Sequence, residues 1–344
     1  MMLISEFDYE LPVEQIAQEP LVDRSGSRML VVDRGTSNFT DNNFVDLPRF
    51  LREDDLLVLN NTKVFPARLF GRTLTGANIE IFLVRETENG LWETLARPAR
   101  RLQPGKRIVF DERLAAKVVE KTDDGKVFIK FEADGDFDEV LDRIGKTPLP
   151  PYIKRGESSV DADRQRYQTV FAKTRGAIAA PTAGLHFTPA ILVSLKESGV
   201  SVAEITLHVG YGTFEPVRVE DLSDHTVAAE RYEIDDEVAI RLNEAKEKGR
   251  RIVAVGTTTT RTLESNLRTF GEFTPGRHLA DLTITPGYNF KAVDALLTNF
   301  HLPQSSLLVL TSTFAGHELI MRSYRHAAAT KYRFYSYGDC MLIV

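Results

Sequence analysis

The sequence predicts an α/β protein that carries a small inserted antiparallel β-barrel. Patterns typical of strands and helices alternate near the N-terminus and again from about residue 160 onward, as expected for a mixed sheet covered by helices. Between these parts, residues 67–132 hold about six short strand-like runs separated by turn residues, with hardly a helical period among them. We therefore expect one discontinuous α/β domain, residues 1–66 plus 152–344, with a barrel domain inserted at 67–151.

The elements of the first half follow from local patterns. "RMLVVD" (28–33) and "LLVLNNT" (56–62) read as strands on either side of a helix-like "DLPRFLRED". The barrel runs are "RLFGRTL", "NIEIFLVRE", "LWETLARPA", "KRIVFD", "AAKVVEKT" and "KVFIKFE", and "KTDDGKV" indicates a hairpin. After a short helix-like "DFDEVLDRIG", the proline-rich "KTPLPPYIKRG" (146–156) predicts an extended linker.

The second half returns to alternating helices and strands. "TPAILVSLKESG" has proline in the first helical turn and glycine just past the end, and "VSVAEITLHVG" follows as a strand. "DDEVAIRLNEAKEKGRR" places Val238, Leu242 and Ala245 on one face, begins acidic and ends basic. It leads into the apolar "IVAVG", so a helix followed by a strand is predicted there.

Composition excludes several classes of protein. Of 344 residues, 42% are hydrophobic and 27% charged, which is typical of a globular protein. The net charge of -6 argues against coating nucleic acid by bulk charge but leaves room for a local basic patch. One cysteine, Cys340, rules out a disulfide framework within the chain and is expected to be a buried apolar residue. With no secretory signal and no membrane-length apolar run, a soluble cytoplasmic protein is predicted.

Four successive threonines, Thr257 to Thr260, stand between a predicted strand and a predicted helix in "GTTTTRTLES" (256–265). At the carboxyl end of a strand, hydroxyls and free N–H groups at a helix start suit an anion or a ribose. The patterns GxxxxGK[ST] and GxGxxG are absent, so this is not a standard nucleotide fingerprint. The alternative is helix capping by one threonine, with the others on a half-buried surface.

Three further segments combine polar groups with glycine or aromatic residues. In "AAPTAGLHFTP" (179–189), Gly184 allows close backbone approach while Thr182 and His186 point into one space, unless the histidine is structural. In "LHVGYGTFEP" (207–216), His208 ends a strand and two glycines bracket Tyr211; a glycine-rich turn with a packed tyrosine is the alternative. Residues 285–306 hold Tyr288, Phe290, Lys291, Asp294, Asn299 and His301. No HxH or HExxH spacing occurs, so no metal site is predicted.

Basic residues gather on the predicted barrel and in the linker. The barrel cluster is "RPARRLQPGKR", and the linker adds two more cations. These clusters are either solvated faces or a surface that contacts a phosphate backbone. The residues are Arg97, Arg100, Arg101, Lys106, Arg107, Lys154 and Arg155.

Long, unusual strings spread from the first ten residues to the last carry a family resemblance. They are "YELPVEQIAQEP", "LLVLNNTKVFPARLFG", "GKTPLPPYIKR", "AAPTAGLHFT", "LHVGYGTFEPV", "VGTTTTRTLES", "DALLTNFHLPQSSLLVL", "FAG" and "YRFYSYGDCMLI". Together they resemble the S-adenosylmethionine:tRNA ribosyltransferase-isomerase family of queuosine biosynthesis.

The resemblance implies an α/β domain with an inserted β-barrel, in agreement with the pattern above. It implies transfer of the ribosyl part of S-adenosylmethionine to 7-aminomethyl-7-deazaguanine at the tRNA wobble position, leaving epoxyqueuosine and releasing adenine and methionine. The partners are then S-adenosylmethionine and tRNA, with no membrane, and a monomer is expected. The sequence departs where the family commonly has His-x-Met-His-x-Glu: it reads His225-Thr-Val-Ala228-Ala-Glu230, which puts the second imidazole's role in doubt.

The reaction asks for a general base, a proton donor to adenine, partners for ribose hydroxyls and an anchor for the methionine carboxylate. It asks for no metal or redox cofactor, because S-adenosylmethionine is a consumed co-substrate. His186 and His208 are the preferred acid/base candidates, with Glu230 and Asp294 behind them. The predicted substrate-binding residues are Thr182, Thr257, Thr258, Thr259, Thr260 and Arg261, the aromatic Tyr211, Phe214 and Tyr288, and the cavity-lining Asn299 and His301.

Two other functions remain open at this point. A methyltransferase would also use S-adenosylmethionine but would leave S-adenosylhomocysteine and no adenine; the missing glycine-rich loop counts against it. A non-catalytic RNA-binding module would use the barrel as an oligonucleotide platform. The net negative charge and the polar clusters of the α/β part disfavour that second alternative.

Overall fold

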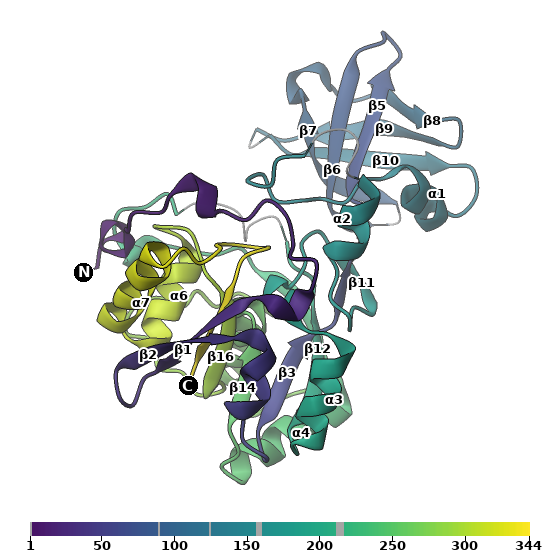
Figure 1. Cartoon of the computed structure of the whole chain (residues 1–344). Coiled ribbons are helices and arrows are strands. Elements are labelled where there is room, and N and C mark those ends of the chain that lie inside the picture. The colour runs from purple at the N-terminus through teal and green to yellow at the C-terminus, as the bar shows by residue number, and fades with distance from the viewer. Residues whose placement is uncertain (1, 89, 124, 156–159, 211–216) are drawn as a thin grey trace.

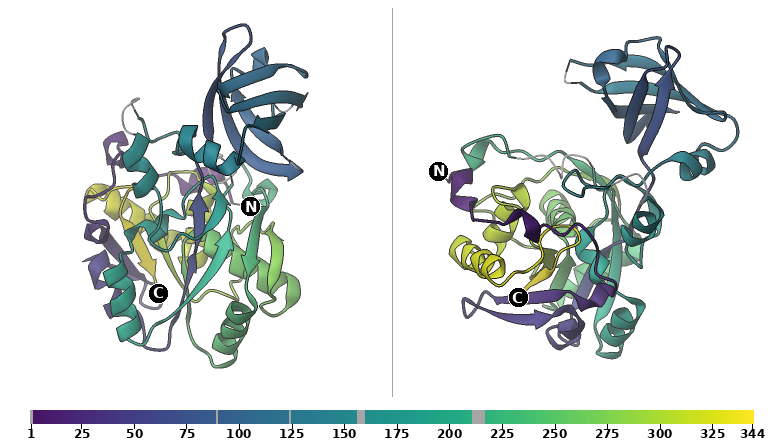
Figure 2. Two further views of the ribbon diagram at one scale, coloured as in Figure 1. Left: turned by 90° about the vertical axis from the view of Figure 1, so that its right-hand side faces the viewer. Right: turned by 45° about the horizontal axis from the view of Figure 1, so that its top comes forward.

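The computed structural model describes residues 2–88, 90–123, 125–155, 160–210 and 217–344. It contains a nine-stranded mixed sheet with helices and a separate closed barrel of six strands. The barrel projects from the α/β part in all three views (Figures 1 and 2). This confirms the predicted fold class, an α/β protein with a small antiparallel β-barrel.

The large sheet has the strand order β15-β13-β12-β3-β14-β16-β17-β1-β2. Its centre is parallel: β3 pairs with β12 and β14, and β14 pairs with β16, all in parallel. Every residue of β3, β14, β16 and β17 is buried, as expected where helices cover both faces of a sheet. The bounds are β1 (Arg28–Asp33), β2 (Asn38–Asn43), β3 (Leu56–Asn60), β12 (Ser201–Leu207), β13 (Glu230–Ile234), β14 (Ile252–Val255), β15 (Gly276–Ala280), β16 (Ala295–Asn299) and β17 (Cys340–Ile343).

Alternate residues of the central strands face two helical layers. Leu56 and Val58 pack with α4 to α7, whereas Leu57 and Leu59 pack with α3 and the 3-10 helix η4. The helix starts follow the sequence: the side chain of Thr188 caps α3, which has Pro189 in its first turn, and Ser305 caps α6. The helices are α3 (Pro189–Glu197), α4 (Asp236–Glu247), α5 (Thr257–Phe270), α6 (Ser306–Ala315) and α7 (His317–Ala329).

The six strand-like runs of the sequence are the six strands of the barrel. The strand order around the barrel is β10-β7-β6-β5-β8-β9, and neighbouring strands are antiparallel. The barrel is closed because β9 also pairs with β10. Alternate residues such as Leu69, Ile79 and Ile81 fill the interior. The bounds are β5 (Arg68–Thr73), β6 (Asn78–Glu88), β7 (Leu91–Arg97), β8 (Arg107–Asp111), β9 (Leu114–Lys121) and β10 (Val127–Ala133), followed by α1 (Phe137–Ile144).

The segment by which the chain leaves the α/β part lies beside the segment by which it returns. β4 (Thr62–Val64), just before the barrel, pairs in parallel with β11 (Thr174–Ala177), which follows it. Helix α2 (Val160–Arg166) lies in this return segment and has no counterpart in the sequence prediction. The segment expected as a helix at 46–54 forms the 3-10 helix η4 (Phe44–Arg49) instead, with Pro48 inside it. The other 3-10 helices are η1 (Ile4–Phe7), η2 (Val13–Gln15), η3 (Arg24–Gly26), η5 (Ala99–Arg101), η6 (Thr182–His186) and η8 (Leu222–Asp224).

Cys340 is fully buried in β17, as expected for a small apolar residue. No helix in the described part of the chain combines the length and apolar character needed to cross a bilayer. Within the described ranges, no three or more His, Cys, Asp or Glu side chains come together as a group that would hold a metal ion.

Candidate active site

The four threonines form the first turn of α5, directly after strand β14. Gly256 precedes them with a φ of 94°, a backbone conformation that glycine adopts at little cost, and no side chain caps the helix. The hydroxyl of Thr259 donates to the carbonyl of Val255 at 2.7 Å, and that of Thr260 to the carbonyl of Gly256 at 3.2 Å. The alternative of capping by one threonine is therefore wrong, because Gly256 is the N-cap residue and all four threonines are buried residues of the helix.

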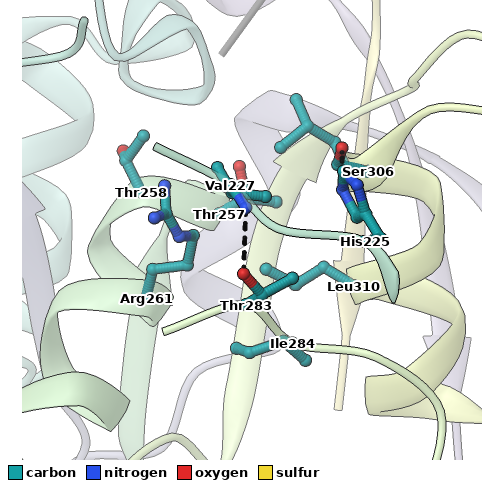
Figure 3. A pocket seen from close by; sticks show the side chains of 10 residues that line it. His225, Val227, Thr257, Thr258, Arg261, Thr283, Ile284, Ser306 and Leu310 are labelled. Atoms are coloured by element: carbon teal, nitrogen blue, oxygen red, sulfur yellow. Dashed lines mark hydrogen bonds between the residues drawn. The ribbon is translucent and has the colours of Figure 1, made fainter. Parts of the chain in front are cut away.

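The hydroxyl-bearing side chains of Thr257 and Thr258 line two adjoining hollows. One hollow lies between the starts of α5 and α6 and the segments 225–227 and 283–284 (Figure 3). The other extends toward residues 179–183, the end of β16 and residues 335–336. Because Thr257, Thr258 and Leu307 line both, we describe them together as the α5 cavity.

The N-terminus of α5, which opens onto the α5 cavity, is suited to binding an anion. The first N–H groups of an α-helix have no partner within the helix, and the peptide dipoles add a partial positive charge there. Thr257 and Thr258 are only 6% and 7% exposed, so hydroxyls and N–H groups meet a ligand in largely desolvated surroundings. This combination suits a carboxylate or sugar hydroxyls.

Arg261 and Glu230 form a buried ion pair beside this helix start. Nη1 of Arg261 lies 2.6 Å from Oε2 of Glu230, and both side chains are 5% exposed. Nε and Nη2 of Arg261 donate to the carbonyls of Leu282, Ala228 and Ala280. Four of its five N–H donors are thus used within the protein, so Arg261 fixes the wall of the cavity.

His186 lies behind the cavity wall and holds Asn299. The amide of Asn299 donates to the carbonyl of Tyr335, so its Oδ1 accepts from Nε2 of His186 at 2.9 Å. Nδ1 of His186 then accepts from the hydroxyl of Ser27, also at 2.9 Å. Burial lowers the pKa of His186 to about 4. A neutral imidazole with both nitrogens engaged positions Asn299, which lines the cavity together with Thr182.

His301 also lines the cavity and is also fully engaged. Its Nε2 is 3.2 Å from the hydroxyl of Thr298 and its Nδ1 is 3.0 Å from that of Tyr324. Burial lowers its pKa to about 3. His301 is therefore neutral near pH 7 and has no free ring nitrogen.

Three predicted site residues lie elsewhere. His208 bonds to the hydroxyl of Thr62 at 2.9 Å, and its neighbour Val209 is the one that faces the cavity. Asp294 precedes β16 and accepts from the N–H of Ile252; it stands five residues, or about 16 Å of strand, from the end where Asn299 lies. Tyr288 donates to Glu264 at 2.9 Å, away from the first turn of α5. Tyr211 and Phe214 lie outside the described residues.

The predicted barrel cluster is exposed, as RNA contact requires. Arg97, Arg100, Arg101, Lys106 and Arg107 all reach solvent, and Arg107 pairs with Glu132 at 2.7 Å. In the linker, Lys154 is exposed. Arg155 is different: it pairs with Asp163 at 2.7 Å and with Glu19 at 3.0 Å, so its charge is offset within the protein and its assignment to RNA is not supported.

Two residues that were not predicted for the site lie beside α5: His225 lines the α5 cavity, and Ala228 contacts Arg261 through its backbone. His225 is half-buried and its Nε2 lies 2.7 Å from the hydroxyl of Ser306, at the first turn of α6 (Figure 3). Ala228, where the family commonly has histidine, has an exposed side chain and uses its carbonyl to accept from Arg261 at 3.2 Å. The only local signal for His225 was its place in the segment that departs from the family pattern.

Comparisons with known proteins cover the whole chain. A family model described as "Queuosine biosynthesis protein" matches residues 4–343. S-adenosylmethionine:tRNA ribosyltransferase-isomerases from Halothermothrix orenii and Moorella thermoacetica are each 49% identical, with 100% of both chains covered. A crystal structure of S-adenosylmethionine tRNA ribosyltransferase from Thermotoga maritima is 39% identical, covers 99% of this chain and 100% of its own, and gives a TM-score of 0.56. The chain belongs to the queuosine biosynthesis protein family.

Proposed function

We propose that the chain is an S-adenosylmethionine:tRNA ribosyltransferase-isomerase of queuosine biosynthesis. One observation carries this function: relatives of that name match at 48–49% identity along the full length of the chain. The enzyme moves the ribosyl part of S-adenosylmethionine to 7-aminomethyl-7-deazaguanine at the tRNA wobble position. Epoxyqueuosine remains in the tRNA, and adenine and methionine are released. S-adenosylmethionine is consumed as a co-substrate, and no other cofactor is required by this chemistry.

S-adenosylmethionine occupies the α5 cavity in this proposal. The methionine carboxylate or the ribose hydroxyls bind the N–H groups and hydroxyls of Thr257 and Thr258. Asn299 and Thr182 offer further polar contacts from the second hollow. Tyr152 and Tyr335 line that hollow with their ring centroids 4.0 Å apart, and such π faces attract a sulfonium as they attract other cations.

The tightly bonded groups of the site act as positioning residues. His186 holds Asn299, and the Glu230–Arg261 pair holds the wall between 228 and 282. Preorganised groups of this kind keep reacting atoms aligned without reorganisation during the reaction. The target base must leave its stack to reach them, since a stacked base is out of reach.

The proposal is tested by incubating the protein with S-adenosylmethionine and tRNA that carries the 7-aminomethyl-7-deazaguanine precursor. Mass spectrometry should then find free adenine, free methionine and a nucleoside heavier by the ribosyl-derived unit. S-adenosylhomocysteine with a methylated nucleoside would instead identify a methyltransferase. Binding of tRNA without any product would identify a non-catalytic RNA-binding module.

Charge reversal on the barrel should weaken tRNA binding. In the variant Arg100→Glu/Arg101→Glu, two exposed cations are replaced, and each lost phosphate contact lowers the salt dependence of log K by about 0.7–0.9. We expect tRNA affinity to fall at least about tenfold at moderate salt and the salt slope to flatten by about 1–2. The affinity for S-adenosylmethionine should stay unchanged. Filter binding at several salt concentrations, together with calorimetry for S-adenosylmethionine, measures both quantities.

The matched control for this prediction carries the same change of charge on the α/β part. Lys196→Glu/Arg250→Glu replaces two exposed cations on and after the helices α3 and α4. If both double variants reduce tRNA affinity equally, the effect is one of net charge and the barrel cluster is not a contact surface. If neither reduces it, the cluster is a solvated face.

We further propose that the protein acts as a monomer in the cytoplasm, where its tRNA substrate is used. Light scattering during size-exclusion chromatography should give a mass near 38.7 kDa. A dimer mass would contradict the proposed monomer without affecting the reaction.

A further inference from the structure

His225 is a cavity-lining histidine with an unengaged ring nitrogen. Its Nε2 lies 2.7 Å from the hydroxyl of Ser306, and the structure gives Nδ1 no hydrogen bond to any described residue. The imidazole projects toward the hollow at the start of α5, on the side of Leu310 and Ser306 (Figure 3). This leaves one nitrogen able to meet a ligand that sits against Thr257 and Thr258.

The remaining histidines do not offer this arrangement. His186 and His301 are buried with both nitrogens bonded. The other four histidines lie outside the α5 cavity and form hydrogen bonds there with other residues. These are His208 on Thr62, His278 on the carbonyl of Pro275, His317 on the carbonyl of Glu6 and His326 on Asp41.

The groups that face His225 keep its imidazole neutral. Arg261 from α5 is the one charged residue lining this hollow, and it is already paired with Glu230. The starts of α5 and α6 add partial positive charge, while Val227, Thr283 and the α6 residues in the lining are uncharged. Asp224, the preceding residue, is exposed to solvent. Partial burial lowers the pKa of His225 below its usual value of 6.5.

The bond to Ser306 is compatible with the tautomer that a base needs. When the Nε2–H of His225 donates to the hydroxyl oxygen of Ser306, the lone pair of the neutral ring stands on Nδ1. That lone pair belongs to the nitrogen to which no described residue forms a hydrogen bond. Ser306 therefore orients the ring in the way that a hydrogen-bonded second group orients a catalytic histidine.

We propose that His225 is the general base of the reaction and that Ser306 is its positioning residue. This inference rests on the proposed function. Nδ1 of His225 takes a proton from C5′ of S-adenosylmethionine: the C–H bond breaks, its electron pair stays on C5′ beside the sulfonium, and an N–H bond forms. That pair then forms the C4′=C5′ double bond as the C4′–O4′ bond breaks, and the freed pair on O4′ forms the C1′ carbonyl as the C1′–N9 bond breaks. Adenine leaves with the electron pair of its glycosidic bond and takes the proton back from the imidazolium. No oxidant or metal is needed to balance these steps.

The variant His225→Gln distinguishes a role of His225 in proton transfer from a purely structural role. The amide of His225→Gln is still able to donate to Ser306 but cannot take up a proton near neutral pH. We expect His225→Gln and His225→Ala to lose about 10²-fold or more in single-turnover rate. Their affinity for S-adenosylmethionine should stay within about threefold of the wild type. Added imidazole should restore part of the rate of His225→Ala, while His317→Gln, at a half-buried histidine outside the cavity, should behave as wild type.

The pH profile supplies a readout that a structural role would not change. The wild-type single-turnover rate should fall as pH drops through the lowered pKa of His225, because protonation removes the base. This limb should disappear in His225→Gln and return, at the pKa of free imidazole, in the rescued His225→Ala. Ser306→Ala should lower the rate about tenfold, and Ser306→Thr should restore it.

The outcomes distinguish this inference from the proposed function. If the wild type forms no adenine and no modified nucleoside, the proposed function fails first. If the wild type forms both and His225→Gln keeps a near-native rate with the acid limb intact, only the assignment of His225 is overturned. Loss of S-adenosylmethionine binding in parallel with loss of rate would also overturn it, since His225 would then serve binding alone.

Discussion

Replacing Arg261 by methionine is expected to lower the free energy of unfolding by about 3–5 kcal/mol, the usual cost of leaving a buried charge without its partner. Glu230 would keep its bond to the N–H of Gly210 but lose the guanidinium 2.6 Å away. The carbonyls of Leu282, Ala228 and Ala280 would lose their donor as well. Urea denaturation followed by circular dichroism measures the change.

A matched control lies on the same helix. Arg268 pairs with Asp281 at 3.1 Å, with side chains 51% and 65% exposed, and Arg268→Met should cost less than about 1 kcal/mol. The double variant Arg261→Met/Glu230→Leu should recover much of the loss, because it removes both charges. A loss below about 1 kcal/mol in Arg261→Met alone would show that the pair does not hold the cavity wall.

The double variant Thr257→Val/Thr258→Val is expected to bind S-adenosylmethionine about 10–100-fold more weakly. Both residues are more than nine-tenths buried and line the α5 cavity, and a hydrogen bond contributes about 0.5–1.5 kcal/mol net, with tenfold in affinity equal to about 1.4 kcal/mol. Valine keeps nearly the same volume, so the helix should remain folded. Isothermal titration calorimetry measures the affinity.

The neighbouring pair of threonines gives the control. Thr259→Val/Thr260→Val removes hydroxyls that bond back to Val255 and Gly256, so it should leave the affinity within about threefold of the wild type. Equal losses in both double variants would mean that the first turn of α5 acts only through its packing. Unchanged affinity in Thr257→Val/Thr258→Val would remove these hydroxyls from the binding site.

The sequence was sufficient for the fold because each element carried its own local pattern. The six barrel strands were separated by turn residues, and α3 combined proline at its start with glycine past its end. Helix α5 followed from the order of an apolar strand, a glycine and four polar residues. Helix α2 was missed because its polar sequence has no apolar period.

The misplaced site residues depended on geometry that spacing does not supply. His208 and Val209 are neighbours on an extended segment, and a shift of one residue decides which side chain faces the cavity. Asp294 precedes the start of β16, whereas Asn299 ends that strand and lines the α5 cavity. Arg155 gave no sign in sequence that Glu19 and Asp163 would fold against it.

His225 shows most clearly what only the three-dimensional structure supplies. Its partner Ser306 is 81 residues away in the chain, and the helix start that both face belongs to a third segment. No local period joins these three segments, since their contact follows from the order of strands in the large sheet. The sequence prediction instead favoured His186, whose nitrogens are both engaged inside the protein.

A crystal structure with bound S-adenosylhomocysteine would show where the substrate binds, because this sulfide has no sulfonium to acidify C5′ and should not react. We expect the ligand in the α5 cavity, with its carboxylate or ribose hydroxyls within hydrogen-bond distance of Thr257 and Thr258. We also expect C5′ to face Nδ1 of His225. A ligand bound elsewhere, for example beside His208 or on the barrel, would contradict this expectation.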